Sequence, residues 1–270
     1  MGTEPKEFWN HRARLLGHTG WSNRAVYNYD QPIRLRAVIS TIKGLFKDLN
    51  ALRILDVGCG TGDLVAELSK RGPDITGIDA SNEVLSIARK RLATASNVQF
   101  HVCNVQDYQD ESHSFDLITS VTVLQHLTEN SDLSRALQRM RSLLKSDGYL
   151  ILLELIPNAR HKIFQGEHVA SRSREQWITY LKDAGFLLAG ERGFPQIGIL
   201  LIQFLGSIRN RSKEKATQVA EVSRNESSFI KALVSRMVLI IAYPFDQLLR
   251  LPTPKSLSLY KIMIFKPQKD

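Results

Sequence analysis

Three glycines at alternate positions follow an apolar run in the segment RILDVGCGTGDL, residues 53–64. The run is typical of a buried β-strand, and Gly58, Gly60 and Gly62 allow the next loop to turn tightly and let a ligand approach the backbone. In an open parallel sheet, ligands bind beyond the carboxyl ends of the strands. The segment therefore predicts a parallel α/β fold with a ligand site at this loop.

Strand-like and helix-like segments alternate along the middle of the chain. The strand-like runs occupy residues 52–57, 74–79, 97–105, 115–123 and 148–155, with further strands beginning at 186 and 257. The helix-like runs occupy residues 63–72, 81–93, 132–148 and 173–185, and the second begins at a Ser cap, Ser81. This alternation predicts an α/β fold with a doubly wound, mostly parallel seven-stranded sheet and helices on both faces.

Two regions lie outside this alternation. Residues 1–50 look helical, and we expect an N-terminal helical lid ahead of a core at 51–193. Residues 194–256 predict a helical cap inserted before the last strand of the core, at 257–270. The apolar runs of this insert are too short or too interrupted for a membrane-spanning helix, which needs about 20 apolar residues.

The insert contains an amphipathic stretch at 228–241, with Lys231 and Arg236 off its apolar stripe. A basic amphipathic helix can lie in the surface of a bilayer. The same stripe could pack on the sheet or form a homodimer interface. The sequence leaves these alternatives open.

The residues around the glycines restrict the ligand. A dinucleotide site would need a third glycine at position 63, where the chain has Asp63, and the lysine of a P-loop is missing. Asp79 ends the second strand, where a carboxylate can accept hydrogen bonds from both hydroxyls of a ribose. The ligand therefore looks like a nucleoside with an amino-acid tail, and an NAD-linked oxidoreductase is disfavoured.

Four segments occur in a familiar order: ILDVGCGTGDL, GIDAS, FDLITSVTVLQHL and LLKSDGYLILLE, between residues 53 and about 155. Together they resemble the class I S-adenosylmethionine-dependent methyltransferases, which implies a Rossmann-like core and S-adenosylmethionine (SAM) as cofactor. The resemblance implies that the methionine part of SAM is lined by Asp56, Gly58, Cys59, Gly60 and Gly62. It assigns no chemistry to the Cys59 thiol.

The resemblance also implies contacts to the rest of SAM. Asp79, followed by Ala80, would hold the ribose, and Asn104 with Val105 stands where the family often has an Asp that contacts adenine. The remaining expected contacts are Ser120 and Val121 at the methyl donor, and Tyr29 or Arg34 over the methionine carboxylate.

Two of these carboxylates have simpler alternative roles. Asp56 could only cap the helix that follows the glycine loop, and Asp79 could only end its strand in a turn.

Methyl transfer to a hydroxyl or a protonated amine is helped by a general base near the acceptor. His126, after the fourth strand, and Glu154, at the end of the fifth, are the candidate catalytic residues. His126 could instead fix its loop, and Glu154 could bind the acceptor or only close its strand. His18, His161 and His168 are further candidates for the base.

The chain carries a net charge of +9, which is concentrated at its two ends. Residues 1–50 hold 8 Lys and Arg against 4 Asp and Glu, and residues 194–270 hold 12 against 5. This asymmetry suits an anionic partner, although a merely solvated basic surface explains it equally well. With the insert, it favours a small hydrophobic or lipid-linked acceptor, with O-methylation preferred.

The alternative functions are a nucleic-acid methyltransferase and a non-catalytic nucleoside-binding protein. No recognised RNA-binding module is present, and SVTV rather than an N-P-P-[YF] motif follows the fourth strand. We expect no metal site, because the carboxylates do not cluster at ligand spacing. The two cysteines and the lack of an apolar leader predict a cytoplasmic protein, with contact to the inner membrane surface as a further hypothesis.

Overall fold

The structure is a computed structural model, and it describes residues 5–20, 24–111, 113–156, 165–166, 168–193 and 260–268. The chain divides into two compact units. The first comprises Met1–Thr19, Leu35–Gly193 and Pro254–Asp270, and the second comprises Gly20–Arg34 and Phe194–Thr253. The predicted insert at 194–256 lies outside the described residues.

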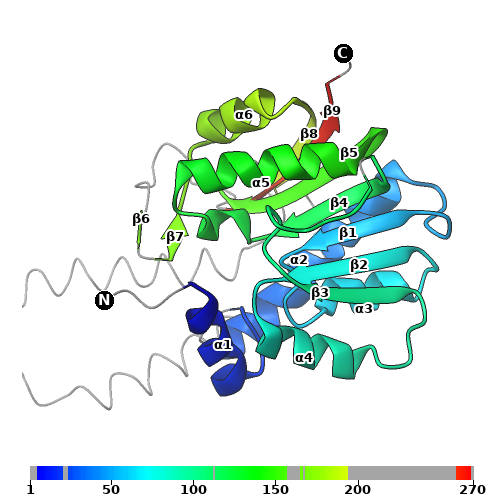
Figure 1. Ribbon diagram of the computed structural model, residues 1–270, viewed down its shortest axis with the longest axis vertical. Helices are drawn as coiled ribbons and strands as arrows, with labels where there is room; N and C mark the ends of the chain where they lie inside the picture. Colours follow the sequence, from blue (N-terminus) through cyan, green and yellow to red (C-terminus); the bar gives the residue numbers. More distant parts are fainter. Residues whose placement is uncertain are drawn as a thin grey trace, which may run out of the picture. The chain divides into compact units, whose positions relative to one another are not determined.

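A seven-stranded sheet forms the centre of the first unit, in the order β3-β2-β1-β4-β5-β9-β8 (Figure 1). Its strands are β1 (Arg53–Val57), β2 (Asp74–Asp79), β3 (Val98–Val102), β4 (Phe115–Val121), β5 (Leu144–Leu155), β8 (Phe186–Gly193) and β9 (Tyr260–Pro267). Strands β1 to β5 pair in parallel, and β9 is antiparallel to both β5 and β8. The predicted mostly parallel, seven-stranded sheet is confirmed.

The strand order reverses between β1 and β4, which makes their carboxyl ends the switch point of the sheet. The glycine loop and the turn after β4 both begin at this point. A separate small hairpin, which the sequence did not reveal, pairs β6 (Gln165–Gly166) with β7 (Val169–Ala170).

The helices follow the predicted segments with local differences. They are α1 (Pro5–Leu16), α2 (Arg24–Leu45), α3 (Asp63–Ser69), α4 (Asn82–Arg91), the short 3-10 helix η1 (Leu124–His126), α5 (Asn130–Leu143) and α6 (Arg174–Asp183). The cap on α4 is confirmed, because Ser81 Oγ accepts the N–H of Val84 at 3.1 Å. The expectation of a helix up to residue 148 is wrong: Leu144 pairs with Phe115 of β4 and begins β5.

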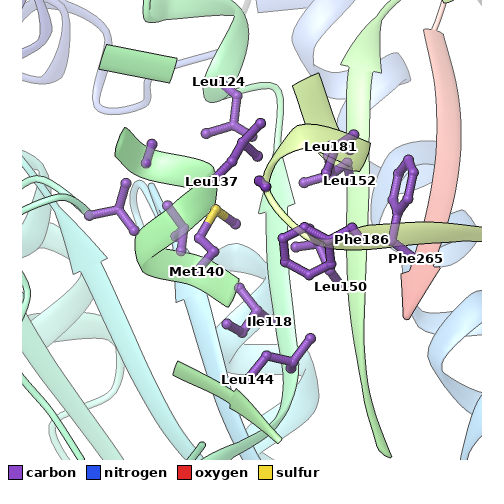
Figure 2. Packing of buried hydrophobic residues seen from close by; sticks show 14 of the residues in the cluster. Ile118, Leu124, Leu137, Met140, Leu144, Leu150, Leu152, Leu181, Phe186 and Phe265 are labelled. Atoms are coloured by element: carbon purple, nitrogen blue, oxygen red, sulfur yellow. The ribbon is translucent and has the colours of Figure 1, made fainter. Parts of the chain in front are cut away.

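The sheet buries apolar side chains on both faces, as expected for parallel strands covered by helices. One face packs against α5 and α6, where Leu137 and Met140 meet Ile118, Leu150 and other residues of the cluster in Figure 2. Because side chains alternate along a strand, the buried residues between them point to the opposite face. Asp56 lies there, whereas Glu154 follows Leu150 and Leu152 on the face of α5 and α6.

Candidate functional site

The loop after β1 follows an irregular path that only small residues permit. Gly58, Gly60 and Gly62 all have positive φ, at 65°, 57° and 76°. A Cβ built on Gly58 would lie 2.3 Å from Val123 Cγ2, because the turn after β4 packs directly on this glycine. At Gly60 the only heavy atom of the described residues within 4 Å of such a Cβ is Thr19 Oγ1, at 3.1 Å. The backbone at Gly60 is therefore accessible to a ligand from the side that a side chain would fill.

Asp79 fastens this loop to the end of β2. Its carboxylate accepts the N–H of Gly60 at 3.1 Å through one oxygen and the N–H of Ser81 at 2.9 Å through the other. Burial raises the pKa of Asp79, while these two backbone hydrogen bonds lower it. Asp79 and Ala80 both keep part of their surface exposed. The carboxylate thus organises the turn and remains available to a ribose.

Asp56 is buried near the end of β1 and accepts a hydrogen bond from Thr119 Oγ1 of β4 at 2.7 Å. Burial raises the pKa of Asp56 to about 7, with a smaller contribution from the Asp79 charge, while the Thr119 bond lowers it. Asp56 does not cap α3, since Gly62 is the N-cap residue and no side chain caps this helix. The Asp63 carboxylate at the start of α3 pairs with Arg91.

The remaining cofactor candidates of the first unit lie at the ends of β3 and β4. Asn104 is exposed and donates a hydrogen bond to Asp107 at 3.2 Å, while Val105 behind it is buried. Ser120 is fully buried opposite Val57, and its Oγ has no hydrogen-bond partner among the described residues. The exposed amide after β3 is a polar group that a nucleoside ligand can reach, whereas the Ser120 hydroxyl is not exposed to a ligand in this structure.

Cys59 is buried in the glycine loop, and its N–H is bonded to the carbonyl of Ile78 at 3.0 Å. Burial, reinforced by the charges of Asp56 and Asp79, raises the pKa of the Cys59 thiol. The thiol therefore stays protonated, in keeping with a small residue that fills space in the loop.

The turn after β4, residues 122–127, begins at the switch point of the sheet, and Glu154 is buried beneath it. Val121 and Val123 are partly exposed, and Thr122 has a positive φ of 57°. The Glu154 carboxylate has no exposed surface and accepts the N–H groups of residues 123, 124 and 125 at 3.2, 2.9 and 3.2 Å. Burial raises the pKa of Glu154 to about 8, against the lowering effect of these three hydrogen bonds.

His126 is held in one tautomer. Its Nδ1 lies 2.5 Å from the carbonyl oxygen of His168, which can only accept, so Nδ1 carries the proton. The lone pair is then on Nε2, which lies 3.4 Å from the amide nitrogen of Gln125. Burial lowers the pKa of His126 and keeps the ring neutral at pH 7. A neutral imidazole can act as a base once an acceptor hydroxyl replaces the Gln125 N–H at Nε2.

Helix α1 contributes residues that the sequence analysis missed. Asn10 Oδ1 accepts a hydrogen bond from Ser81 Oγ at 2.6 Å, immediately after Asp79 and Ala80. The Trp9 ring meets His126 edge-on, with centroids 4.7 Å apart, and Phe8 packs on His168 at 4.3 Å. One helix therefore contacts both the loop after β2 and the turn after β4. The adjacent Phe and Trp in a helical N-terminal segment were the only sequence signal.

Four predicted residues remain: Tyr29, Arg34, His161 and His18. Tyr29 and Arg34 are buried residues of the second unit, and Arg34 pairs with the Asp30 carboxylate. Their proposed contact with the methionine carboxylate stays a prediction. His161 lies outside the described residues, and His18 is buried near the end of the α1 segment.

No group of three or more His, Cys, Asp or Glu side chains in the described part of the chain could hold a metal ion. Among the helices in those same ranges, none is long and apolar enough to cross a membrane.

Comparison with known proteins agrees with this geometry. A family model described as a methyltransferase domain matches residues 54–148. The chain is 30% identical over 181 residues to demethylmenaquinone methyltransferase of Thermotoga maritima, a match that spans 65% of this chain and 74% of that protein. The chain belongs to the class I S-adenosylmethionine-dependent methyltransferases.

Other methyltransferases match over shorter stretches. The ubiquinone biosynthesis O-methyltransferase of Aliivibrio fischeri is 28% identical over 135 residues, which is 49% of this chain and 55% of that protein. The chain thus spans about half the length of this relative. Phosphoethanolamine N-methyltransferase 2 of Haemonchus contortus, solved with S-adenosyl-L-methionine, superposes with a TM-score of 0.60 at 16% identity, over 99% of this chain and 60% of that one. At that identity the likeness shows the fold alone.

Proposed function

We propose that this methyltransferase binds SAM at the glycine loop and transfers its methyl group to a small hydrophobic or lipid-linked acceptor, with O-methylation favoured. The main support for this proposal is the glycine loop at Gly58–Gly62, which Asp79 holds at the switch point of the sheet through a hydrogen bond. SAM, when bound, supplies a methyl group that its sulfonium has already activated. The protein's part is to hold donor and acceptor in line and to exclude water.

The residues fit a nucleoside with an amino-acid tail. The open side of Gly60 admits close approach to the backbone, and the Asp79 carboxylate can accept from ribose hydroxyls. Asn104 is exposed for a base edge, and the buried Asp56 carboxylate offers a counter-charge to an ammonium. We assign Tyr29 or Arg34 to the methionine carboxylate on the family resemblance.

The proposed acceptor rests on three supports. Two relatives are named for demethylmenaquinone and for ubiquinone biosynthesis, which concern hydrophobic molecules. The turn that carries His126 is bordered by the aromatic rings of Phe8 and Trp9. The segment 194–255 is basic and amphipathic in sequence, which suits peripheral contact with an anionic membrane at the cytoplasmic face.

His126 is the proposed general base. Its Nε2 lone pair and its neutral state at pH 7 meet the chemical requirement for taking a proton from an acceptor hydroxyl. Helix α1 is the proposed lid, because it contacts Ser81 on the cofactor side and His126 on the acceptor side.

The test is transfer of a tritiated methyl group from SAM into a cell extract, followed by partition into organic, aqueous and acid-precipitable fractions. We expect label in the organic fraction, and none with the Asp79→Ala variant. Aqueous label only would reject the hydrophobic acceptor, and nuclease-sensitive precipitable label would indicate nucleic acid. No label in any fraction would contradict methyl transfer.

The membrane contact has a separate test. We expect the protein to float with anionic liposomes at low salt and to be released by high salt, because electrostatic attraction is screened. Failure to bind at low salt would refute the membrane contact and favour core packing or a dimer interface for residues 194–255.

A further inference from the structure

Glu154 is a carboxylate enclosed in apolar surroundings. It lies at the second-last position of β5, after Leu150 and Leu152, and the same cluster includes Leu124 and Ile156. Its exposed fraction is 0%. A carboxylate buried in this way is costly unless its oxygens are hydrogen-bonded, so its partners indicate what it does.

Those partners are three consecutive backbone groups of one turn. One carboxylate oxygen accepts the N–H groups of Val123 and Leu124, and the other accepts that of Gln125. The Gln125 side chain makes a second connection between the turn and β5, since its Oε1 accepts the N–H of Leu155 at 3.2 Å. The end of β5 and the turn after β4 therefore hold each other through two side chains.

This turn has a backbone conformation that its own residues do not favour. Thr122 is β-branched and has a φ of 57°, in the left-handed region that such residues rarely adopt. Its N–H is bonded to the Leu153 carbonyl at 2.6 Å. A conformation of this kind persists only where the surroundings enforce it. The hydrogen bonds to Glu154 begin at the next residue, Val123, and hold the turn in this conformation.

The shape of the turn determines two contacts of the site. Val123 packs on Gly58 so closely that its Cγ2 would be 2.3 Å from an added Cβ. His126, the proposed base, lies one residue beyond the three bonded N–H groups, and its Nε2 lies 3.4 Å from the side-chain amide of Gln125, the last of those residues. Both the glycine loop and the imidazole thus take their position from a segment that Glu154 holds.

We propose that Glu154 is a positioning residue, which fixes the turn at residues 122–127 and through it places Val123 on the glycine loop and His126 beside the acceptor. The placement of His126 beside an acceptor rests on the proposed function, whereas the turn and its contact with Gly58 belong to the protein alone. Glu154 does not serve as the base, because three of its four acceptor positions are occupied by backbone N–H groups and none of its surface is exposed.

The test compares Glu154→Gln with Glu191→Gln. The amide of a glutamine keeps the shape of the side chain but turns one oxygen into a donor, which faces an N–H of the turn. Glu191 is a matched control, since its side chain is only 3% exposed, it pairs with Arg174, and it lies on the edge strand β8. Amide hydrogen exchange of residues 122–127, the Kd of S-adenosylhomocysteine and the pH profile of kcat are measured for both variants.

We expect E154Q to speed amide exchange in the turn and to raise the Kd of S-adenosylhomocysteine, each by about 10-fold or more, since the new amide donor leaves a buried backbone N–H without an acceptor. The value of kcat should fall while the shape of its pH profile stays the same. E191Q should match the wild type in the turn. Unchanged exchange in E154Q would overturn the proposal, and so would a loss of kcat with unchanged exchange and unchanged Kd, which would make Glu154 a base.

If E154Q does not fold, Val123→Ala provides the second test. It removes the side chain that packs on Gly58 and leaves Glu154 in place. A higher Kd of S-adenosylhomocysteine is expected, and an unchanged Kd would overturn the link between turn and glycine loop. A wild-type protein that binds no S-adenosylhomocysteine would refute the proposed function, while the exchange comparison would still decide whether Glu154 holds the turn.

Discussion

Replacing Gly58 by alanine would put a methyl group into space that Val123 already fills. The added Cβ would lie 2.3 and 2.6 Å from the two Cγ atoms of Val123, whereas carbon atoms in contact are about 3.5–4.0 Å apart. Valine has one strongly preferred rotamer in most settings and cannot easily turn away. The backbone at Gly58 must also keep its φ of 65°, which costs an alanine about 1–2 kcal/mol. Overpacking adds about 1–3 kcal/mol.

The expected loss of unfolding free energy in Gly58→Ala is therefore about 2–5 kcal/mol, or roughly 5–15 °C in melting temperature. Gly60→Ala is the matched control. Its φ is 57°, and its added Cβ would meet only Thr19 Oγ1 at 3.1 Å, so we expect a loss of about 1–2 kcal/mol. Gly60→Ala should nevertheless weaken S-adenosylhomocysteine binding strongly, because the methyl group occupies the open side of the loop.

Urea denaturation of the two variants, and of Gly58→Ala combined with Val123→Ala, tests this reasoning. The double-mutant cycle should show a favourable coupling of about 1–3 kcal/mol, since Val123→Ala removes the clash. The steric argument is refuted if Gly58→Ala loses no more stability than Gly60→Ala, or if the coupling is zero.

Three further predictions concern pH, the helix α1 and the base. Burial raises the pKa of Asp56 to about 7 and of Glu154 to about 8, so the stability that these two groups contribute to the ligand-free protein should be complete below about pH 4 and be lost as the pH rises from there through 7 to 8. Urea denaturation of Asp56→Asn should give a flatter profile between pH 5 and pH 9, and an identical profile would contradict the raised pKa. Trp9→Ala should lower kcat/KM about 2- to 10-fold, because it removes the ring that contacts His126. Leu15→Ala is the control and should leave kcat/KM unchanged, since Leu15 is 70% exposed on the same helix. Equal effects of the two substitutions would contradict a role for the contact between Trp9 and His126. His126→Asn should lower kcat about 100- to 10,000-fold and remove the acidic limb of the pH–rate profile, which burial of His126 shifts below the usual pKa of an imidazole. A retained acidic limb would rule out His126 as the base.

The sheet could be predicted because its signals are local. The strand predicted at 52–57 is observed at Arg53–Val57, and Ser81 caps its helix as expected, since apolar runs and capping residues act over a few positions. The boundary between α5 and β5 could not be predicted in this way. Leu144 continues the helical apolar pattern of α5, but pairing with Phe115 of β4 draws it into the sheet.

In the candidate site, too, some contacts could be predicted from the sequence and others could not. The glycine loop and Asp79 could be placed together because the carboxyl ends of neighbouring parallel strands meet at one edge. The contact of Asn10 with Ser81 joins residues 71 positions apart, and a periodic pattern in the sequence does not reveal contacts at that separation. The role of Glu154 was equally hidden, because its partners are backbone N–H groups, which every non-proline residue has.

Strand β9 has a consequence for how this protein is made. It lies between β5 and β8, and among the strands that the structure describes β8 pairs with β9 alone. On the ribosome, β1 to β5 can assemble as soon as they emerge, but β8 has no neighbour until residues 260–267 have been synthesised. During that interval the edge of β5 is an unpaired row of backbone groups, open to pairing with another chain. We therefore expect nascent chains that stop before β9 to need chaperones and to aggregate, even though they already contain the whole glycine loop.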